Sequence, residues 1–306
     1  MRRFAITAMA AAALLLAALP VPGGETDMAE AAGFPPPGTR PLRLLFIHHS
    51  CGGQLLAPPG PVQGGAKGSG RRCIYDSHPN GGDLRRLLAE AGYEVHELSY
   101  ESVLGEHTDI GDWPPKFRDH LDDLLATDEQ DRRYTDGRRN HIVVFKSCYT
   151  NSDFVGEGEE PGDPTVPELT VANAKAAYRA LLPVFRSRPD VLFVAVTAPP
   201  RATPRRGWKD RLLGWLRRGP TPADHARAFN TWLTDREHGW LAGYDLPNVA
   251  VFDYYDILTG HGRSNWLVYP TGDGHDSHPS RAGNAEAARA FVTFLQQAVA
   301  RMQAER

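Results

Sequence analysis

Apolar runs of strand length alternate along the chain with segments of helical period. The strand candidates span 42–48, 93–98, 141–146, 191–197 and 249–252, and the apolar residues within them are mostly consecutive. Consecutive apolar residues are typical of strands covered on both faces. The pattern therefore predicts parallel strands buried between layers of helices.

Three segments between or after these runs repeat apolar residues at helical spacing. They carry Leu84, Leu87 and Leu88; Tyr178, Leu181, Leu182 and Phe185; and Phe291, Leu295, Ala298 and Met302. Strands alternating with helices form right-handed βαβ units. The predicted fold class is α/β, a three-layer α/β/α sandwich with a central parallel sheet of about five strands. Ligands of such sheets bind at the carboxyl ends of the strands.

A serine follows the first predicted strand directly. Residues 47–53 read Ile-His-His-Ser-Cys-Gly-Gly, so Ser50 sits on a strand-to-loop turn with two glycines behind it. Such a turn exposes the hydroxyl at the carboxyl end of the strand and aims a backbone N–H at the same point. Ser50 is a candidate nucleophile, and the alternative is a serine that caps the following segment.

An asparagine follows the third predicted strand in a similar position. Residues 146–153 read Lys-Ser-Cys-Tyr-Thr-Asn-Ser-Asp. The side-chain amide of Asn151 is suited to donate to a developing oxyanion. The alternative is an Asx turn that closes the loop.

A histidine with neighbouring carboxylates precedes the last predicted helix. Residues 273–280 read Asp-Gly-His-Asp-Ser-His-Pro-Ser, which places His278 before a proline and after two aspartates. A carboxylate selects the tautomer of such a histidine and stabilises the imidazolium that forms. His278 is therefore a candidate general base.

The three segments together resemble the SGNH (GDSL-like) hydrolases over about residues 42–300, in a divergent form typical of exported bacterial members. The resemblance implies a flavodoxin-like sheet and matches Ser50 to the nucleophile and Asn151 to the oxyanion asparagine. It implies that Gly105 supplies a second oxyanion N–H, with Gly111 as the fallback. It matches His278 to the catalytic histidine.

This chain departs from the family pattern in each motif. Ser50 lies in His-His-Ser-Cys-Gly instead of Gly-Asp-Ser, and Tyr149 replaces the glycine of Gly-x-Asn. The usual aspartate three residues before the histidine is His275 here. Looser branches read Asp-Ser-His-Pro, so the orienting role goes to Asp276, with Asp273 or a Ser-His dyad as alternatives.

The function that the resemblance implies is a serine esterase, which releases an acyl or acetyl group from a carbohydrate, envelope or lipid ester. This chemistry needs no metal or organic cofactor. The formal net charge of -3 provides no global positive field, so nucleic acid is not an expected partner. The rival hypothesis is an inactive glycan-binding protein on the same fold. A membrane-tethered structural protein is the third.

The beginning of the chain predicts export. Two arginines precede an apolar run over 4–19, and prolines and small residues follow, which is typical of a secretory signal peptide. We expect the signal peptide and the start of the linker over 1–31, a Pro-rich linker over 32–41 and the catalytic domain over 42–306. An exported chain is secreted or periplasmic, and an uncleaved N-terminal anchor is the alternative.

Three cysteines would then meet an oxidising compartment. Cys51 and Cys148 flank the candidate site and lie after neighbouring strands, so a Cys51–Cys148 disulfide is one hypothesis. A Cys51–Cys73 pair, no disulfide at all, and Cys51 as nucleophile are the alternatives.

An earlier Asp-Ser-His-Pro segment, at 76–79, repeats the later one. We interpret His78 as a loop residue that lines the cleft. A metal site shared by His48, His49, His78 and Asp76 is disfavoured because neighbouring strand positions point to opposite faces.

A basic insertion over 201–220 is a separate feature. Arginines and one lysine interleave there with tryptophans and leucines, the composition of a basic amphipathic helix. The segment predicts peripheral membrane contact through 201–218, a lid over the cleft, or an ordinary surface helix.

Overall fold

The computed structural model describes residues 33–61, 76–205 and 219–305. The predicted signal peptide, Cys73 and most of the basic insertion lie outside the described residues. One compact unit begins at Gly33, and Phe34 is buried in its core. The segment predicted as a linker therefore packs onto the domain, because its aromatic side chain has an apolar surface to cover.

A five-stranded parallel sheet forms the centre of the unit, in the order β2-β1-β5-β6-β7. Its strands are β1 Leu42–Ile47, β2 Tyr93–Leu98, β5 Ile142–Lys146, β6 Leu192–Val196 and β7 Val249–Phe252. The predicted α/β class and parallel sheet are confirmed, and the strand bounds differ from the predicted ones by at most one residue at either end. The order is the one expected of a flavodoxin-like sheet.

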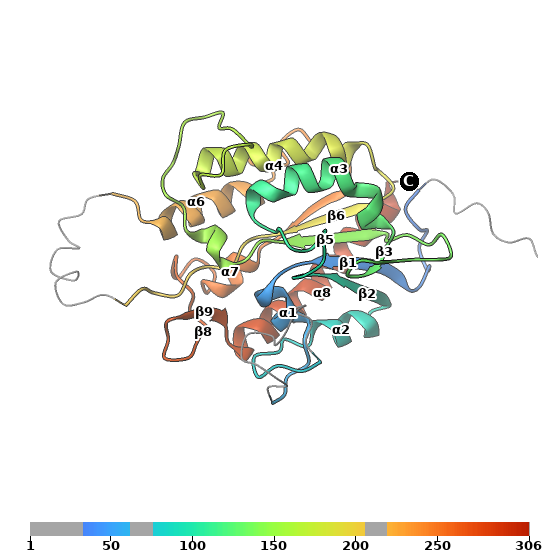
Figure 1. Ribbon diagram of the computed structural model, residues 1–306, viewed down its shortest axis with the longest axis horizontal. Coiled ribbons are helices and arrows are strands. Elements are labelled where there is room, and N and C mark those ends of the chain that lie inside the picture. Colours follow the sequence, from blue (N-terminus) through green and yellow to red (C-terminus); the bar gives the residue numbers. More distant parts are fainter. Residues whose placement is uncertain (1–32, 62–75, 206–218, 306) are drawn as a thin grey trace, which may run out of the picture. The chain divides into compact units, whose positions relative to one another are not determined.

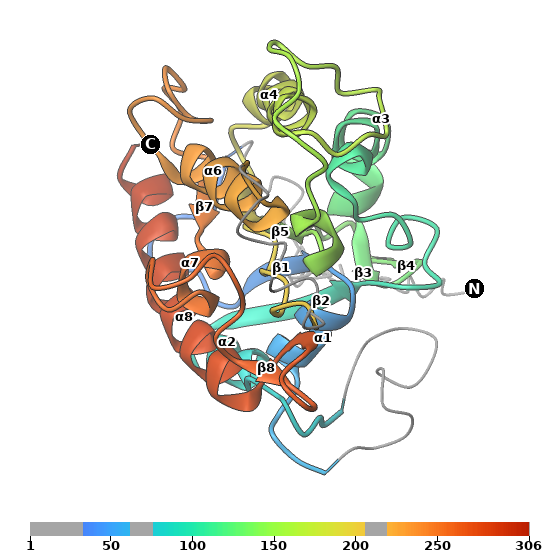
Figure 2. The ribbon, with the colours of Figure 1, turned by 90° about the vertical axis from the view of Figure 1, so that its left-hand side faces the viewer.

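Helices cover both faces of the sheet (Figures 1 and 2). One face carries α1 Ser50–Leu56, α2 Leu84–Glu90 and α8 Arg281–Ala304; the other carries α3 Trp113–Leu125, α4 Val171–Arg186 and α6 Pro222–Thr234. Leu44 and Phe46 of β1 belong to the first core and Leu45 and Ile47 to the second. Alternate residues of one strand thus serve two cores, which is why its apolar run is continuous.

The remaining elements are short and lie mostly between the strands and the larger helices. They are η1 Ile110–Asp112, β3 Thr127–Glu129, β4 Arg132–Arg133, η2 Tyr149–Ser152, α7 Tyr254–Leu258, β8 Pro270–Thr271 and β9 Asp276–Pro279. In Figure 1, η2, α7 and the β8–β9 hairpin gather at the carboxyl end of the sheet, beside α1. This is the end at which the sequence predicts the site.

No helix among the described residues is long and apolar enough to cross a membrane.

Candidate active site

The turn after β1 places Ser50 at the first position of α1. The strand ends at Ile47, His49 has extended backbone angles at the N-cap position, and the helix begins with Ser50. The helix packs tightly on the strand end, because a Cβ at Gly52 would lie 2.4 Å from the Cβ of His48. Glycine at this position therefore lets the turn close and fixes the direction of the Ser50 side chain.

His278 reaches this serine from the opposite end of the chain. Its Nε2 lies 3.0 Å from Ser50 Oγ, and its Nδ1 lies 2.7 Å from Asp276 Oδ1. Both distances are those of hydrogen bonds. Ser50, His278 and Asp276 thus form a continuous hydrogen-bonded chain, with Nδ1–H donating to the carboxylate and Nε2 accepting the serine hydroxyl.

Asp276 is held in its ionised form by the same histidine. Partial burial by itself would raise the pKa of the carboxyl, but the hydrogen bonds from the backbone N–H and the ring of His278 lower that pKa below its ordinary value. The alternative orienting residue, Asp273, is exposed and pairs with Arg205. The Nδ1 of His275 contacts the carbonyl of Thr203 instead of an atom of Ser50, His278 or Asp276. Of these neighbours, the structure brings only Asp276 against His278.

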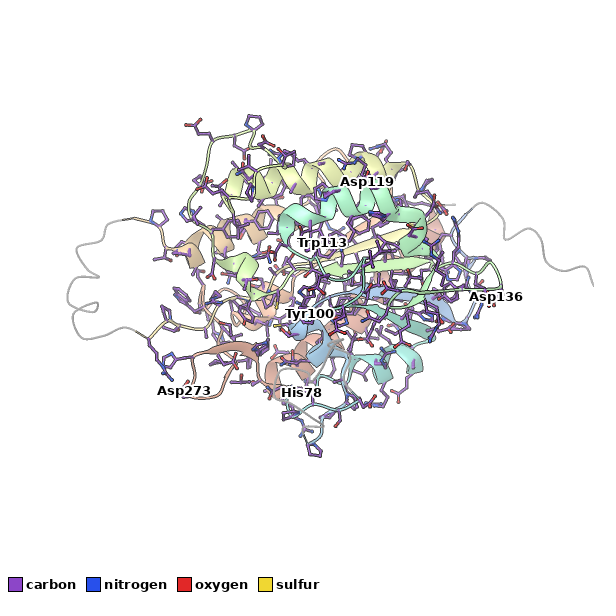
Figure 3. All side chains as sticks on the ribbon, in the orientation of Figure 1. His78, Tyr100, Trp113, Asp119, Asp136 and Asp273 are labelled. Carbon is purple, nitrogen blue, oxygen red and sulfur yellow. The ribbon has the colours of Figure 1, made fainter. Side chains whose placement is uncertain are left out.

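The β8–β9 hairpin that carries His278 is tied to the fold at several points. The buried amide of Asn284 in α8 donates to the carbonyls of Pro279 and Asn80 and accepts the hydroxyl hydrogen of Tyr254. Ser277 accepts the backbone N–H of Ala202. These bonds hold the histidine loop against the loops that follow β6 and precede α2. In Figure 3, Asp273 is labelled at the lower left and His78 at the bottom, whereas Asp136 lies at the right-hand end.

The oxyanion prediction is corrected at Gly105. Its N–H donates to the carbonyl and the hydroxyl of Ser102, each at 3.1 Å, and its carbonyl accepts from His49 Nε2. A Cβ here would meet the backbone of Ser99 at 2.2 Å. The glycine is thus required by close backbone packing within its own turn, and its N–H is not available to an oxyanion. The fallback, Gly111, is exposed on η1.

Asn151 lies in η2 and is buried. Its Nδ2 donates to Asp109 Oδ1 at 2.7 Å and lies 3.4 Å from Thr150 Oγ1, and its Oδ1 accepts the backbone N–H of Ile110 at 2.8 Å. The acceptor bond fixes which way the amide is turned. These hydrogen bonds orient Asn151 through the loop before α3, and none of the three joins it to Ser50.

Three contacts of aromatic rings at the site were not predicted from the sequence. The Tyr149 ring lies edge-to-face against the His278 ring, with centroids 5.1 Å apart, and the guanidinium of Arg201 lies over Tyr149. His49 stacks on Tyr100 at 3.8 Å. The one sequence signal for these contacts was Tyr149 itself, which stands where the hydrolases that the sequence resembles have a glycine. Its ring fills the space beside His278.

A buried polar network lies behind the nucleophile turn. His48 is fully buried, with its Nδ1 2.9 Å from the carbonyl oxygen of His49 and its Nε2 2.9 Å from Oε1 of the buried Glu97. Glu97 also pairs with Arg85. Burial lowers the pKa of His48 to about 3. His48 and His49 therefore face different partners, and the described residues contain no group of three histidine, cysteine or acidic side chains that could hold a metal ion.

His78 is buried in the connection before α2, where its backbone pairs with Pro58 and Gly60. Burial lowers its pKa, and the nearby His278 lowers it further. The residue therefore lies within electrostatic range of the candidate base.

No protein-family model matches the chain, and no curated protein matches it. Among solved structures, it is similar to a carbohydrate esterase whose active site displays divergent catalytic and non-catalytic binding functions. The identity is 17%, the TM-score is 0.37, and the match covers 85% of this chain and 66% of that one. A likeness of this degree carries no functional argument, so the function is argued from the side chains alone.

Proposed function

We propose that the protein is a serine hydrolase of the SGNH type that cleaves an ester bond of a carbohydrate, envelope or lipid substrate. The observation that carries the proposal is the chain from Ser50 Oγ to His278 Nε2, at 3.0 Å, and from His278 Nδ1 to Asp276 Oδ1, at 2.7 Å. A hydroxyl, an imidazole and a carboxylate in this order are the nucleophile, the base and the orienting group of acyl transfer.

In the proposed reaction, His278 Nε2 removes the hydroxyl proton as Ser50 Oγ attacks the ester carbonyl. In the proposal, the negative charge that develops on the carbonyl oxygen is stabilised by the backbone N–H of Ser50, in the first turn of α1, and by the Asn151 amide hydrogen that exchanges its long 3.4 Å contact with Thr150 Oγ1 for the oxyanion. The imidazolium then protonates the leaving alcohol. Water attacks the acyl-serine with the same histidine as base, and the acid is released.

The rival proposal is a binding protein for glycans that turns over slowly or not at all. One observation favours it: the Gly105 N–H is committed to Ser102, and Asn151 already donates to Asp109. Loss of one oxyanion donor costs roughly 3 kcal/mol in the transition state. A site with fewer donors retains substrate recognition while its rate falls.

Export through the N-terminal signal peptide belongs to the same proposal and places the enzyme outside the cytoplasm. Membrane contact through 201–218 remains a prediction, since the structure describes only residues 201–205 of this segment.

The experiment compares hydrolysis of p-nitrophenyl acetate and longer acyl esters by the mature protein and by variants. Ser50→Ala and His278→Ala are expected to lower kcat/KM to the background rate. His275→Ala is the matched control, because this histidine lies in the same β8–β9 hairpin and its Nδ1 contacts the carbonyl of Thr203 instead of Ser50. His78→Ala tests the earlier Asp-Ser-His-Pro segment and is expected to keep its turnover.

A fluorophosphonate probe provides a second readout that does not depend on the substrate. Labelling of the Ser50 peptide in the unaltered protein, and its absence in His278→Ala, is expected for an activated serine. One shared background rate in all proteins, with no labelled Ser50, would reject the esterase and leave glycan binding as the function to test.

A further inference from the structure

Two cysteine thiols lie beside the candidate nucleophile, one in contact with Ser50 and the other in contact with the first. Cys148 Sγ is 3.5 Å from Ser50 Oγ and 3.6 Å from Cys51 Sγ, and both cysteines are free and buried. The contact follows from the register of the sheet, in which Ile47 at the end of β1 lies opposite Phe145 of β5. The turns after these two strands therefore run side by side and bring the sulfur atoms together.

The surroundings make Cys148 the more acidic of the pair. Contact with the Cys51 side chain, the positive charge of Lys146 and the Cys51 backbone N–H favour the thiolate, so the pKa of Cys148 falls well below its ordinary value despite burial. Burial raises the pKa of Cys51. The thiolate is the reactive form of cysteine, so Cys148 is the sulfur that attacks first.

We propose that Cys148 and Cys51 form a modification site for small peroxide oxidants, which convert the pair into a disulfide beside Ser50. In the first step, the Cys148 sulfur attacks one oxygen of hydrogen peroxide, an S–O bond forms, the O–O bond breaks and hydroxide leaves. In the second, the Cys51 sulfur attacks the sulfenic sulfur, the S–S bond forms and the hydroxyl leaves as water with the Cys51 proton. Two electrons pass from the two sulfurs to the peroxide.

The consequence for turnover rests on the proposed function. A disulfide bond is about 2.05 Å long, so the sulfurs move toward each other and the Cys148 sulfur becomes neutral. An anionic sulfur in contact with Ser50 opposes the negative charge that develops during attack on the ester. The oxidised protein is therefore expected to hydrolyse ester faster than the reduced one, by roughly tenfold.

The test uses the full chain with Cys73→Ser, so that a Cys73 disulfide does not confuse the result. The reduced protein is treated with hydrogen peroxide, free thiols are alkylated, and peptides are mapped without reduction. The expected result is one crosslinked peptide pair that joins Cys51 to Cys148, lighter by two hydrogens and split by dithiothreitol. Both peptides recovered as alkylated thiols, or a Cys148 sulfinic acid without any crosslink, would overturn the proposal.

Three variants separate this site from the esterase. Ser50→Ala in the same Cys73→Ser background is expected to form the Cys51–Cys148 crosslink fully although it does not hydrolyse ester. The peptide mapping therefore tests the disulfide even if the esterase assay fails. Cys51→Ser is expected to stop at the sulfenic acid on Cys148. A rise of about tenfold in p-nitrophenyl acetate hydrolysis on crosslinking, absent in Cys148→Ser, supports the rate effect. An unchanged or lower rate after complete crosslinking overturns it.

Discussion

One carboxylate oxygen of Asp276 accepts two hydrogen bonds from His278, from the backbone N–H at 3.0 Å and from Nδ1 at 2.7 Å. The two residues are only two positions apart in β9, so the strand itself forms a small ring that fixes the imidazole. Nδ1 then carries the hydrogen, and Nε2 faces Ser50. A spacing of two thus brings the carboxylate to the ring nitrogen that an orienting aspartate would have to reach.

Asp276→Asn is expected to lower kcat by roughly 100-fold, because an amide at this position favours the wrong histidine tautomer. The loss is smaller than that of a fully buried triad aspartate because half of the Asp276 side chain is exposed to solvent. Steady-state ester hydrolysis measures it. Asp273→Asn removes an equally short and exposed carboxylate nearby and is expected to keep kcat; equal losses in the two variants would contradict the assignment.

Asn151→Ala is expected to lower kcat by roughly 100-fold with little change in KM, since an oxyanion donor acts on the transition state. Single-turnover and steady-state kinetics separate the two parameters. Asn140→Ala is a control for the loss of a buried amide, because Asn140 donates to Leu124 and Thr127 away from the site. A drop in Asn151→Ala that appears in KM alone would point to substrate binding instead.

Tyr149→Ala is expected to lower kcat by about tenfold, because the ring that packs against His278 is lost and the imidazole gains freedom to rotate. Tyr149→Phe keeps the ring and should retain most of the activity. If the phenylalanine variant loses as much as the alanine variant, the hydroxyl and not the ring is the important group.

Gly52→Ala is expected to destabilise the fold by about 1–3 kcal/mol, since the new methyl group overlaps the side chain of His48. Urea unfolding gives the free energy of unfolding. Gly111→Ala is the matched control, because a Cβ there meets nothing within 4 Å and the φ angle is not in the left-handed region. A loss of stability in both variants alike would contradict the packing argument at the nucleophile turn.

Acid is expected to destabilise the protein through His48. Its pKa is about 3 in the folded chain and near 6.5 unfolded, so between these values the unfolded chain binds a proton that the folded chain does not. Protonation then favours unfolding, and stability falls as the pH decreases through this window, by up to about 1.4 kcal/mol per pH unit. Urea unfolding at pH 7, 5 and 4 should show a shallower slope in His48→Asn than in the unaltered protein. His275→Asn, at an exposed histidine, should keep the original slope.

The sequence by itself determined the sheet, because most of its strands are nearly continuous apolar runs, although β2 reads Tyr-Glu-Val-His-Glu-Leu. The predicted strand at 93–98 is β2 and the one at 249–252 is β7, without a shift at either end. It also determined that Ser50, Asn151 and His278 follow strand ends or precede the last helix, since parallel strands bring such positions to one edge.

Only the tertiary structure decided which side chains meet at that edge. Hydrogen-bond partners depend on side-chain directions between segments up to 228 positions apart, as for Ser50 and His278, and local pattern does not contain them. The structure therefore chose Asp276 over Asp273, removed Gly105 from the oxyanion donors and set Cys148 against Ser50. A glycine required by backbone packing and a glycine that offers a free N–H look the same in sequence, and contact with Ser99 and Ser102 distinguishes them.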